Sequence, residues 1–277
     1  MNYVINPMDS NDLRSFLDEK AKKIIKYFIL KSLISQPESI IGQNSLPIQV
    51  PKEHIEQWFT QALNVKPIGA GSYPIDVYSE SKKWGADLKM LNMAVNKNGE
   101  PLDSTSGEAS LGQKFTGTAK SLDTLFAQKS YTQIKNAWLN LYKDKINKAT
   151  TDYKLNDIIY FFVLRPNLRS KNEASFYLCG AKLDIESINK VEIDRATDTS
   201  LFLKSFIDTN YGNTKIYKSK KRLELRLRPK FWIDNNKTIK ITTTFNPKNI
   251  NLRDSKINFN FIQKRISDIS KTKITFS

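Results

Sequence analysis

The sequence has little of the two residue types that most often bind transition metals or act as nucleophile and base. It contains one cysteine, Cys179, and one histidine, His54, in 277 residues. A single cysteine excludes an internal disulfide and a cysteine-rich zinc site, and a single histidine excludes a metal site built on several histidines. No serine or cysteine lies close to His54 in the sequence, and we interpret it as a helix-surface residue. Any chemistry is therefore expected from carboxylates and lysines.

Long apolar runs and a secretion signal are also missing. The longest apolar run, residues 158–164, has the length of a buried strand and not that of a membrane span. Residues 1–7 lack the basic start, apolar middle and small-residue cleavage site of a secretory signal. We therefore expect a cytoplasmic protein without a membrane partner. Apolar residues make up 39% of the chain, which is enough for a sizeable core.

Acidic residues are outnumbered by basic ones. Lys and Arg total 44, Asp and Glu total 28, and the formal net charge is +16, which favours binding to polyanions. The C-terminal third has a basic stretch that contains Lys215, Lys218, Lys220, Lys221, Arg222, Arg226, Arg228 and Lys230, interleaved with Tyr217, Phe231 and Trp232. We expect nucleic acid as the partner. A general lysine bias, an acidic membrane surface or an acidic protein is the alternative explanation.

Apolar periodicity divides the chain into helices and strands. Apolar residues three and four apart predict helices at residues 9–35, 52–64 and 119–149. Short apolar or alternating segments between turn residues predict strands at 65–69, 72–79, 84–93, 157–165 and 174–183. Alternation at 222–228, 239–245 and 257–261 predicts half-buried antiparallel strands with a basic outer face.

This succession of helices and strands is typical of an α/β or α+β fold with a mixed central sheet flanked by helices. No internal repeat and no long Gly- or Pro-rich linker divides the chain. We therefore predict one domain over residues 1–277. It comprises an N-terminal helical segment (1–50), a core (52–190) and a β-rich basic extension (200–277).

Acidic and basic side chains coincide on the predicted strand 84–93. Asp87 and Lys89 alternate with apolar residues there, so they project from the same face. Asp76 lies on the preceding strand, and a hairpin turn at residues 80–83 would bring its carboxylate close to that of Asp87. Two neighbouring carboxylates repel at neutral pH unless they share a proton or a cation. A divalent ion between them would also bind a phosphate.

Simpler interpretations exist for each of these residues. An acid followed two residues later by lysine also occurs at 18–20, 80–82, 152–154 and 254–256. Asp87 and Lys89 could form an ion pair on an exposed strand, and Asp76 could be a turn acid. Glu56, on the predicted helix 52–64, could be a helix-surface acid. The copy at Asp87 differs from the others because its strand is flanked by apolar residues and is preceded by both other acids.

The order of these features resembles the core of PD-(D/E)XK nucleases, as found in type II restriction endonucleases. A helix with an acid precedes three strands, with Pro-x-Asp on the second and Asp-x-Lys on the third, and a helix and a strand follow, over residues 52–165. The resemblance implies that Asp76 and Asp87 are the two metal-binding acids and that Lys89 is the motif lysine. It implies, less directly, that Glu56 is the helix acid with which some members hold a second ion.

The resemblance also implies a restriction-endonuclease-like fold and a function. The protein would be a Mg²⁺-dependent type II restriction endonuclease, with one or two Mg²⁺ ions per active site, that hydrolyses phosphodiester bonds of double-stranded DNA at a short specific sequence. A homodimer would match a palindromic site, and a cognate DNA methyltransferase would be its genetic partner. A non-catalytic basic nucleic-acid-binding protein and a PD-(D/E)XK repair or transposon nuclease remain the alternatives.

Basic residues of two segments are the candidates for DNA contacts. Lys114 belongs to the connection that follows the motif strand, and the others belong to the basic stretch of the C-terminal third. Arginines can pair with guanine edges, and lysines can hold phosphates. The expected DNA-binding residues are Lys114, Lys220, Lys221, Arg222, Arg226 and Arg228.

Overall fold

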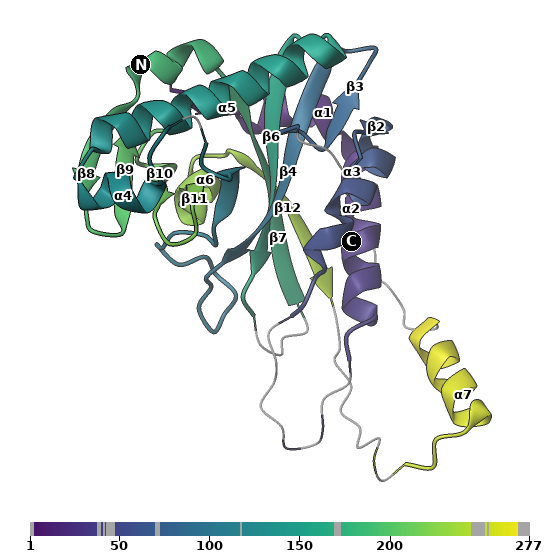
Figure 1. Ribbon diagram of the computed structural model, residues 1–277. Coiled ribbons are helices and arrows are strands. Elements are labelled where there is room, and N and C mark those ends of the chain that lie inside the picture. Colours follow the sequence, from purple (N-terminus) through teal and green to yellow (C-terminus); the bar gives the residue numbers. More distant parts are fainter. Residues whose placement is uncertain are drawn as a thin grey trace.

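The computed structural model describes residues 3–37, 40, 42, 48–69, 73–116, 118–168, 173–244, 253 and 255–270. In these residues the chain forms two β-sheets with helices packed around them (Figure 1). The expectation of a mixed α/β fold is thereby confirmed.

The first sheet contains the strands expected to carry the site. Its order is β1 (Ile5–Pro7), β7 (Glu173–Leu183), β6 (Asp157–Pro166), β4 (Trp84–Met93), β3 (Val77–Ser79) and β2 (Lys66–Pro67), and β12 (Thr238–Thr244) also pairs with β7. The second sheet has the order β5 (Ala109–Gln113), β11 (Arg222–Leu227), β10 (Gly212–Tyr217), β9 (Ser200–Lys204) and β8 (Glu192–Ala196). Among these strand pairs, β4 and β6 are parallel and the others are antiparallel.

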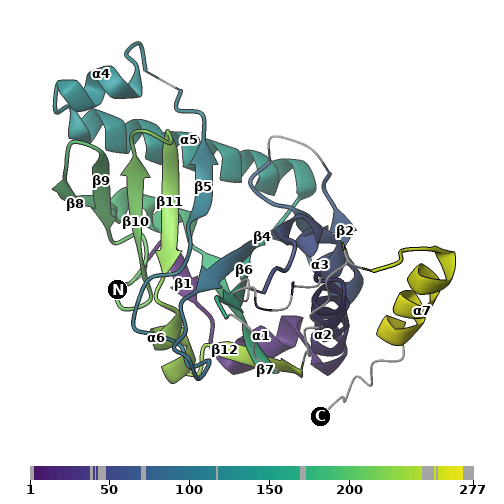
Figure 2. The same cartoon turned by 90° about the horizontal axis from the view of Figure 1, so that it is seen from below.

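The helices differ in length and position. The α-helices are α1 (Ser10–Phe16), α2 (Glu19–Ile34), α3 (Ile55–Leu63), α4 (Leu122–Ala127), α5 (Tyr131–Tyr153), α6 (Pro229–Asp234) and α7 (Phe259–Ser270), and the short 3-10 helices are η1 (Lys52–His54) and η2 (Ile185–Lys190). None of the described helices has the length and apolar character that crossing a membrane requires. In both views α7 lies at the periphery, away from the two sheets (Figures 1 and 2).

Helices and the second sheet cover the two faces of the first sheet. Ile159 and Phe161 of β6 pack on the side of α1, α2 and α3. Tyr160 and Phe162 point the other way and pack with α5 and the second sheet. Because both faces are buried, residues 158–164 are apolar in succession rather than in alternation. The parallel pairing of β4 with β6 requires a crossover connection, which includes α5 (Figure 1).

Two of the predicted helices are divided. The helix predicted at residues 9–35 is interrupted because Asp18 begins α2 as its N-cap, accepting a hydrogen bond from the N–H of Ala21. The helix predicted at 119–149 consists of α4 and α5, separated at Lys129, whose φ is 53°. A residue with positive φ cannot continue a right-handed helix. Apolar periodicity persists across both breaks, which explains why it predicted single helices.

Most of the predicted strands of the core are present. Those predicted at 84–93, 157–165 and 174–183 are confirmed as β4, β6 and β7. Those predicted at 65–69 and 72–79 are shorter, as β2 and β3, and residues 70–72 lie outside the described residues.

The last third contains one wrong prediction. β11 and β12 confirm the alternating strands predicted at 222–228 and 239–245, although residue 245 lies outside the described residues. The segment 257–261 does not form a strand but leads into α7. Phe259, Ile262 and Ile266 follow a spacing of three and four residues, as on one face of a helix, and three alternating apolar residues are too few to exclude this.

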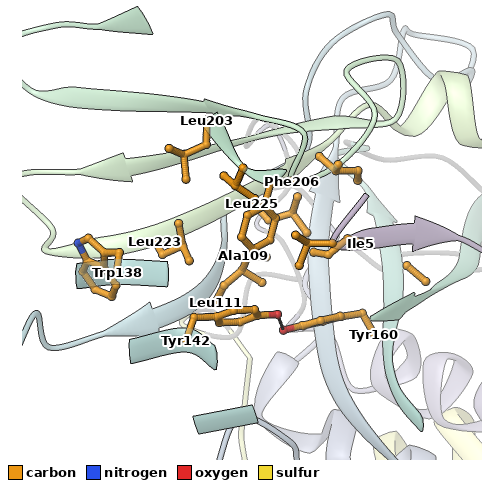
Figure 3. Packing of buried hydrophobic residues seen from close by; sticks show 14 of the residues in the cluster. Ile5, Ala109, Leu111, Trp138, Tyr142, Tyr160, Leu203, Phe206, Leu223 and Leu225 are labelled. Atoms are coloured by element: carbon orange, nitrogen blue, oxygen red, sulfur yellow. Dashed lines mark hydrogen bonds between the residues drawn. The ribbon is translucent and has the colours of Figure 1, made fainter. Parts of the chain in front are cut away.

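The two sheets form one packed body. β12, from the segment 200–277, belongs to the first sheet, and β5, from the segment 52–190, belongs to the second. One hydrophobic cluster contains Leu225 of β11, Trp138 of α5 and Tyr160 of β6 (Figure 3). The predicted boundary near residue 200 therefore does not separate the sheets.

A pair of tyrosines crosses this cluster between α5 and β6. The hydroxyl groups of Tyr142 and Tyr160 point toward each other and form a hydrogen bond of 2.7 Å (Figure 3). Both residues are almost entirely buried, at 2% and 0% exposure. Each hydroxyl is thus the partner that makes burial of the other tolerable.

This pairing predicts the outcome of a double-mutant cycle. Tyr142→Phe and Tyr160→Phe should each lower the free energy of unfolding by about 1–3 kcal/mol, because each leaves the other buried hydroxyl without its partner. The double variant should lose less than the sum of the two, because it leaves neither hydroxyl behind. Urea denaturation of the four proteins measures the coupling. Additive losses would show that the two hydroxyls do not depend on each other.

Candidate active site

The candidate site is built around β4 in the first sheet. Asp87 and Lys89 project from the same face of this strand, and the Lys89 ammonium forms an ion pair with Oδ1 of Asp87. The Asp87 side chain is 8% exposed and that of Lys89 is 24% exposed. The simpler interpretation is an ion pair of Asp87 and Lys89 on an exposed strand. The ion pair is present, but the strand is not exposed at this point, because the Asp87 carboxylate is buried. Only the lysine reaches partly to solvent.

Asp76, the residue immediately before β3, lies opposite Asp87. Val77 of β3 pairs with Ala86 of β4, and the N–H of Asp76 donates to the Ala86 carbonyl at 2.8 Å, so the antiparallel register places Asp76 opposite Asp87. Oδ2 of Asp76 accepts a hydrogen bond of 2.7 Å from the N–H of Leu88. The Asp76 carboxylate lies close enough to Asp87 to raise the pKa of Asp87. The two acids expected to converge are therefore brought together, with Lys89 on the same face.

Burial changes the acidity of Asp87. The pKa of Asp87 is raised from 3.8 to about 7, and removal from water is the largest cause of this net shift. Lys89 opposes this shift, whereas the nearby Asp76 carboxylate adds to it by repulsion. In the register of β4 and β6, Asp87 lies beside Tyr160, so the tyrosine pair forms part of its dry surroundings. When no metal ion is bound, Asp87 is therefore expected to take up a proton near neutral pH.

Lys89 is held in its charged form. Burial alone lowers the pKa of its ammonium group, but Asp87, Asp76 and Glu56 together outweigh burial, and the net shift is upward. Glu56 lies in the first turn of α3 and is exposed, yet its pKa is raised by partial desolvation and then by Asp76, with Lys89 opposing. Glu56 therefore lies within electrostatic range of the site without belonging to its buried centre.

Asp76 and Asp87 are the acids of the site that could bind a metal ion. In the described parts of the chain, no group of three or more His, Cys, Asp or Glu side chains has an arrangement that could hold a metal ion. Asp76 and Asp87 nevertheless offer carboxylate oxygens from opposite positions in the register, which suits Mg²⁺ in kind, and their mutual repulsion is the type that a cation relieves. Asp76 and Asp87 could together bind one ion. Among the described residues, Glu56 does not join them as a third ligand.

A cleft of about 490 Å³ opens where β4 continues beyond Lys89. Its lining includes Asn92 and Arg165, the latter at the end of β6. Arg165 donates from Nε to Oδ1 of Asn92 at 2.9 Å and from Nη1 to the carbonyl of Val50 at 2.6 Å. These residues did not emerge from the sequence, because the contact joins positions far apart in the chain. The wall of the cleft also contains Glu108, which immediately precedes β5.

The residues expected to contact DNA lie on and around β11. Arg222 and Arg226 belong to the strand, Lys220 and Lys221 to the turn before it, and Arg228 to the start of α6. Lys114 follows β5, the neighbour of β11, and is exposed. Several of these cations are paired with acids: Lys221 with Asp123 at 3.7 Å, Arg228 with Asp103 at 2.9 Å, and both Lys220 and Arg226 with Glu108. The basic stretch is therefore partly neutralised within the molecule.

Comparison with known proteins finds no relative of this chain. No family model, no curated protein and no solved structure matches the chain. The geometry of Asp76, Asp87 and Lys89 and the cleft beside them are therefore the features that bear on function.

The raised pKa of Asp87 predicts how stability depends on pH. The folded protein holds a proton on Asp87 more tightly than the unfolded chain does, so this group's contribution to stability is lost as pH rises from 3.8 through about 7. In that window the free energy of unfolding attributable to Asp87 should fall by up to ~1.4 kcal/mol per pH unit. Urea denaturation of the wild type and Asp87→Asn across the window gives this contribution as the difference between them.

Asp144→Asn is the matched control, because Asp144 is an exposed carboxylate on α5. The difference between the wild type and this variant should not change over the same pH range. If the wild type and Asp87→Asn keep a constant difference, Asp87 titrates normally and the dry environment assigned to it is wrong.

Proposed function

We propose that this protein is a metal-dependent phosphodiesterase that cleaves double-stranded DNA, of the restriction endonuclease type. The observation that carries the proposal is that Asp76, directly before β3, lies opposite Asp87 of β4, with Lys89 on the same face of β4. A parallel strand, β6, supports this face and follows a long helical crossover, in the order expected for a PD-(D/E)XK core. The net charge of +16 supports a polyanionic substrate.

The residues of the site suit distinct roles. Asp76 and Asp87 would hold Mg²⁺, which when bound supplies polarisation of the scissile phosphate and activation of the attacking water. Lys89 remains an ammonium group because its pKa is raised, so it acts as a hydrogen-bond donor and positive charge toward the developing phosphorane and not as a base. The Leu88 N–H fixes the Asp76 carboxylate in position. The buried surroundings of Asp87 strengthen each of these electrostatic interactions.

The wider setting belongs to the same proposal. The cleft beyond Lys89 and the cations around β11 would receive the DNA, a homodimer would match a two-fold symmetric site, and a cognate methyltransferase would protect the host DNA. One observation favours the alternative of a non-catalytic DNA-binding protein, namely that Lys89 already neutralises Asp87. A repair or transposon nuclease would share the site and differ in substrate.

Cleavage of phage and plasmid DNA tests the proposal. The wild type should cut with Mg²⁺ and lose this activity when a chelator is added. Asp87→Asn and Lys89→Ala should each lower the rate by at least ~10²-fold, because each removes charge that stabilises the transition state. Both variants should remain folded and still bind DNA in Ca²⁺.

Asp144→Asn again serves as the control and should cut at the wild-type rate. Near-normal turnover in Asp87→Asn or Lys89→Ala would remove the site from the reaction. Tight DNA binding by the wild type without cleavage of any DNA offered, in Mg²⁺ or Mn²⁺, would favour the non-catalytic alternative.

A further inference from the structure

Two cations of the basic stretch converge on one carboxylate. Arg226, from β11, donates through Nη2 to Oε1 of Glu108, and Lys220, from the turn before β11, donates through Nζ to Oε2. The two oxygens of Glu108 are thus held by two different cations. In the second sheet Glu108 lies next to β5, which pairs with β11.

A second acid lies beneath this pair. Glu224 of β11 is 1% exposed, and neither of its carboxylate oxygens has a hydrogen bond with any residue that the structure describes. The ammonium groups of Lys215 and Lys220 each lie 3.9 Å from one of these oxygens. Glu224 therefore attracts the two lysines from inside the protein and keeps them over this part of the sheet.

The side chains of Lys220 and Arg226 are partly exposed on this face of the sheet, at 41% and 31%. The apolar side chains of β11, including Leu223 and Leu225, face the core shared with α5. Glu224 and Arg226 alternate with them and face the other way. In Figure 2, α5 passes behind the second sheet, and none of the described helices crosses in front of it. A long polyanion could therefore reach Arg226 and Lys220.

The arrangement suits a phosphate better than it suits Glu108. Two cations that hold the two oxygens of a carboxylate can hold two oxygens of a phosphate in the same way, and arginine favours such paired contacts. Nε of Arg226 is buried and has no hydrogen-bond acceptor among the described residues. A phosphate has an additional oxygen to offer to this N–H, whereas Glu108 already uses both of its oxygens.

The position also connects with the candidate active site. Glu108 lines the cleft that contains Asn92, and Gly107 donates a backbone hydrogen bond of 2.8 Å to the Asn92 carbonyl. Asn92 follows Lys89 by three residues on β4, which is roughly 10 Å along the strand. One nucleic-acid strand could therefore contact both places.

We propose that Lys220 and Arg226 form a seat for a backbone phosphate of bound DNA and that Glu108 occupies this seat in the free protein as an internal competitor. The proposal rests on the proposed function in that DNA is the polyanion that enters the cleft. Binding of DNA displaces Glu108 from both cations. Glu224 stays in place and keeps Lys220 positioned during the exchange.

Fluorescence anisotropy with a labelled DNA duplex, in chelator so that no cleavage occurs, tests the exchange. Glu108→Gln should bind about two- to fivefold more tightly than the wild type, because the phosphate no longer displaces an ion-paired carboxylate. Lys220→Ala should weaken binding and reduce the slope of log K against log salt by ~0.9. In a Lys220→Ala/Arg226→Ala background, Glu108→Gln should give no gain.

Glu192→Gln is the control, because it removes the same charge from an exposed pair with Lys204 at the far edge of the same sheet. A gain in Glu108→Gln that is absent from Glu192→Gln supports the seat, whereas equal gains or no gain overturn it. If Glu108→Gln fails to fold, as judged by circular dichroism, Glu108→Asp replaces it. Its shorter side chain cannot hold both cations, and the same gain is expected.

The binding of the wild type separates the two proposals. A wild type that binds no DNA at low salt overturns the proposed function, and the seat with it. Tight wild-type binding with no gain in Glu108→Gln overturns the seat alone.

Discussion

The parallel pairing of β4 with β6 determines where the charged side chains of this protein can lie. Its register runs from Trp84 opposite Asp157 to Met93 opposite Pro166, so the whole of β4 is held beside a strand that is buried on both faces. A carboxylate on β4 is consequently desolvated by its neighbours in the sheet. The same pairing demands the crossover that includes α5, which seals the other side of Tyr160. The topology therefore places Asp87 of β4 in surroundings that exclude water.

Burial of an ion pair at this place has no obvious benefit for stability. A buried pair such as Asp87 and Lys89 recovers through mutual attraction only part of what its two charges lose on leaving water, and apolar residues of similar size are often at least as stabilising. Asp76 makes the balance worse, because it adds a second negative charge beside the first. A cluster that costs stability in the free protein is typical of a functional site and supports the assignment of chemistry to it.

Much of the centre could be predicted from local patterns, whereas its surroundings could not. The apolar flanks of β4 and the hairpin before it were enough to predict its bounds and to bring Asp76 opposite Asp87. Periodicity says nothing about contacts such as that of Glu108 with Arg226, which joins residues 118 positions apart. It also misread residues 257–261, where too few apolar positions distinguish alternation from a helical face. Side chains that come into contact only through tertiary structure have no regular spacing in the sequence, so periodicity cannot predict their contact.

The shared edge of β7 has a consequence for how the chain is made. β1 and β12 lie end to end along this edge, with Ile5 opposite Leu183 and Thr238 opposite Cys179. During synthesis from the N-terminus, this edge of β7 at residues 173–179 therefore stays unpaired until residues 238–244 of β12 have been synthesised. Its backbone groups and the apolar side chains of Phe176 and Leu178 are then open to pairing with another chain. Any nascent or truncated polypeptide that ends before β12 carries this unprotected strand.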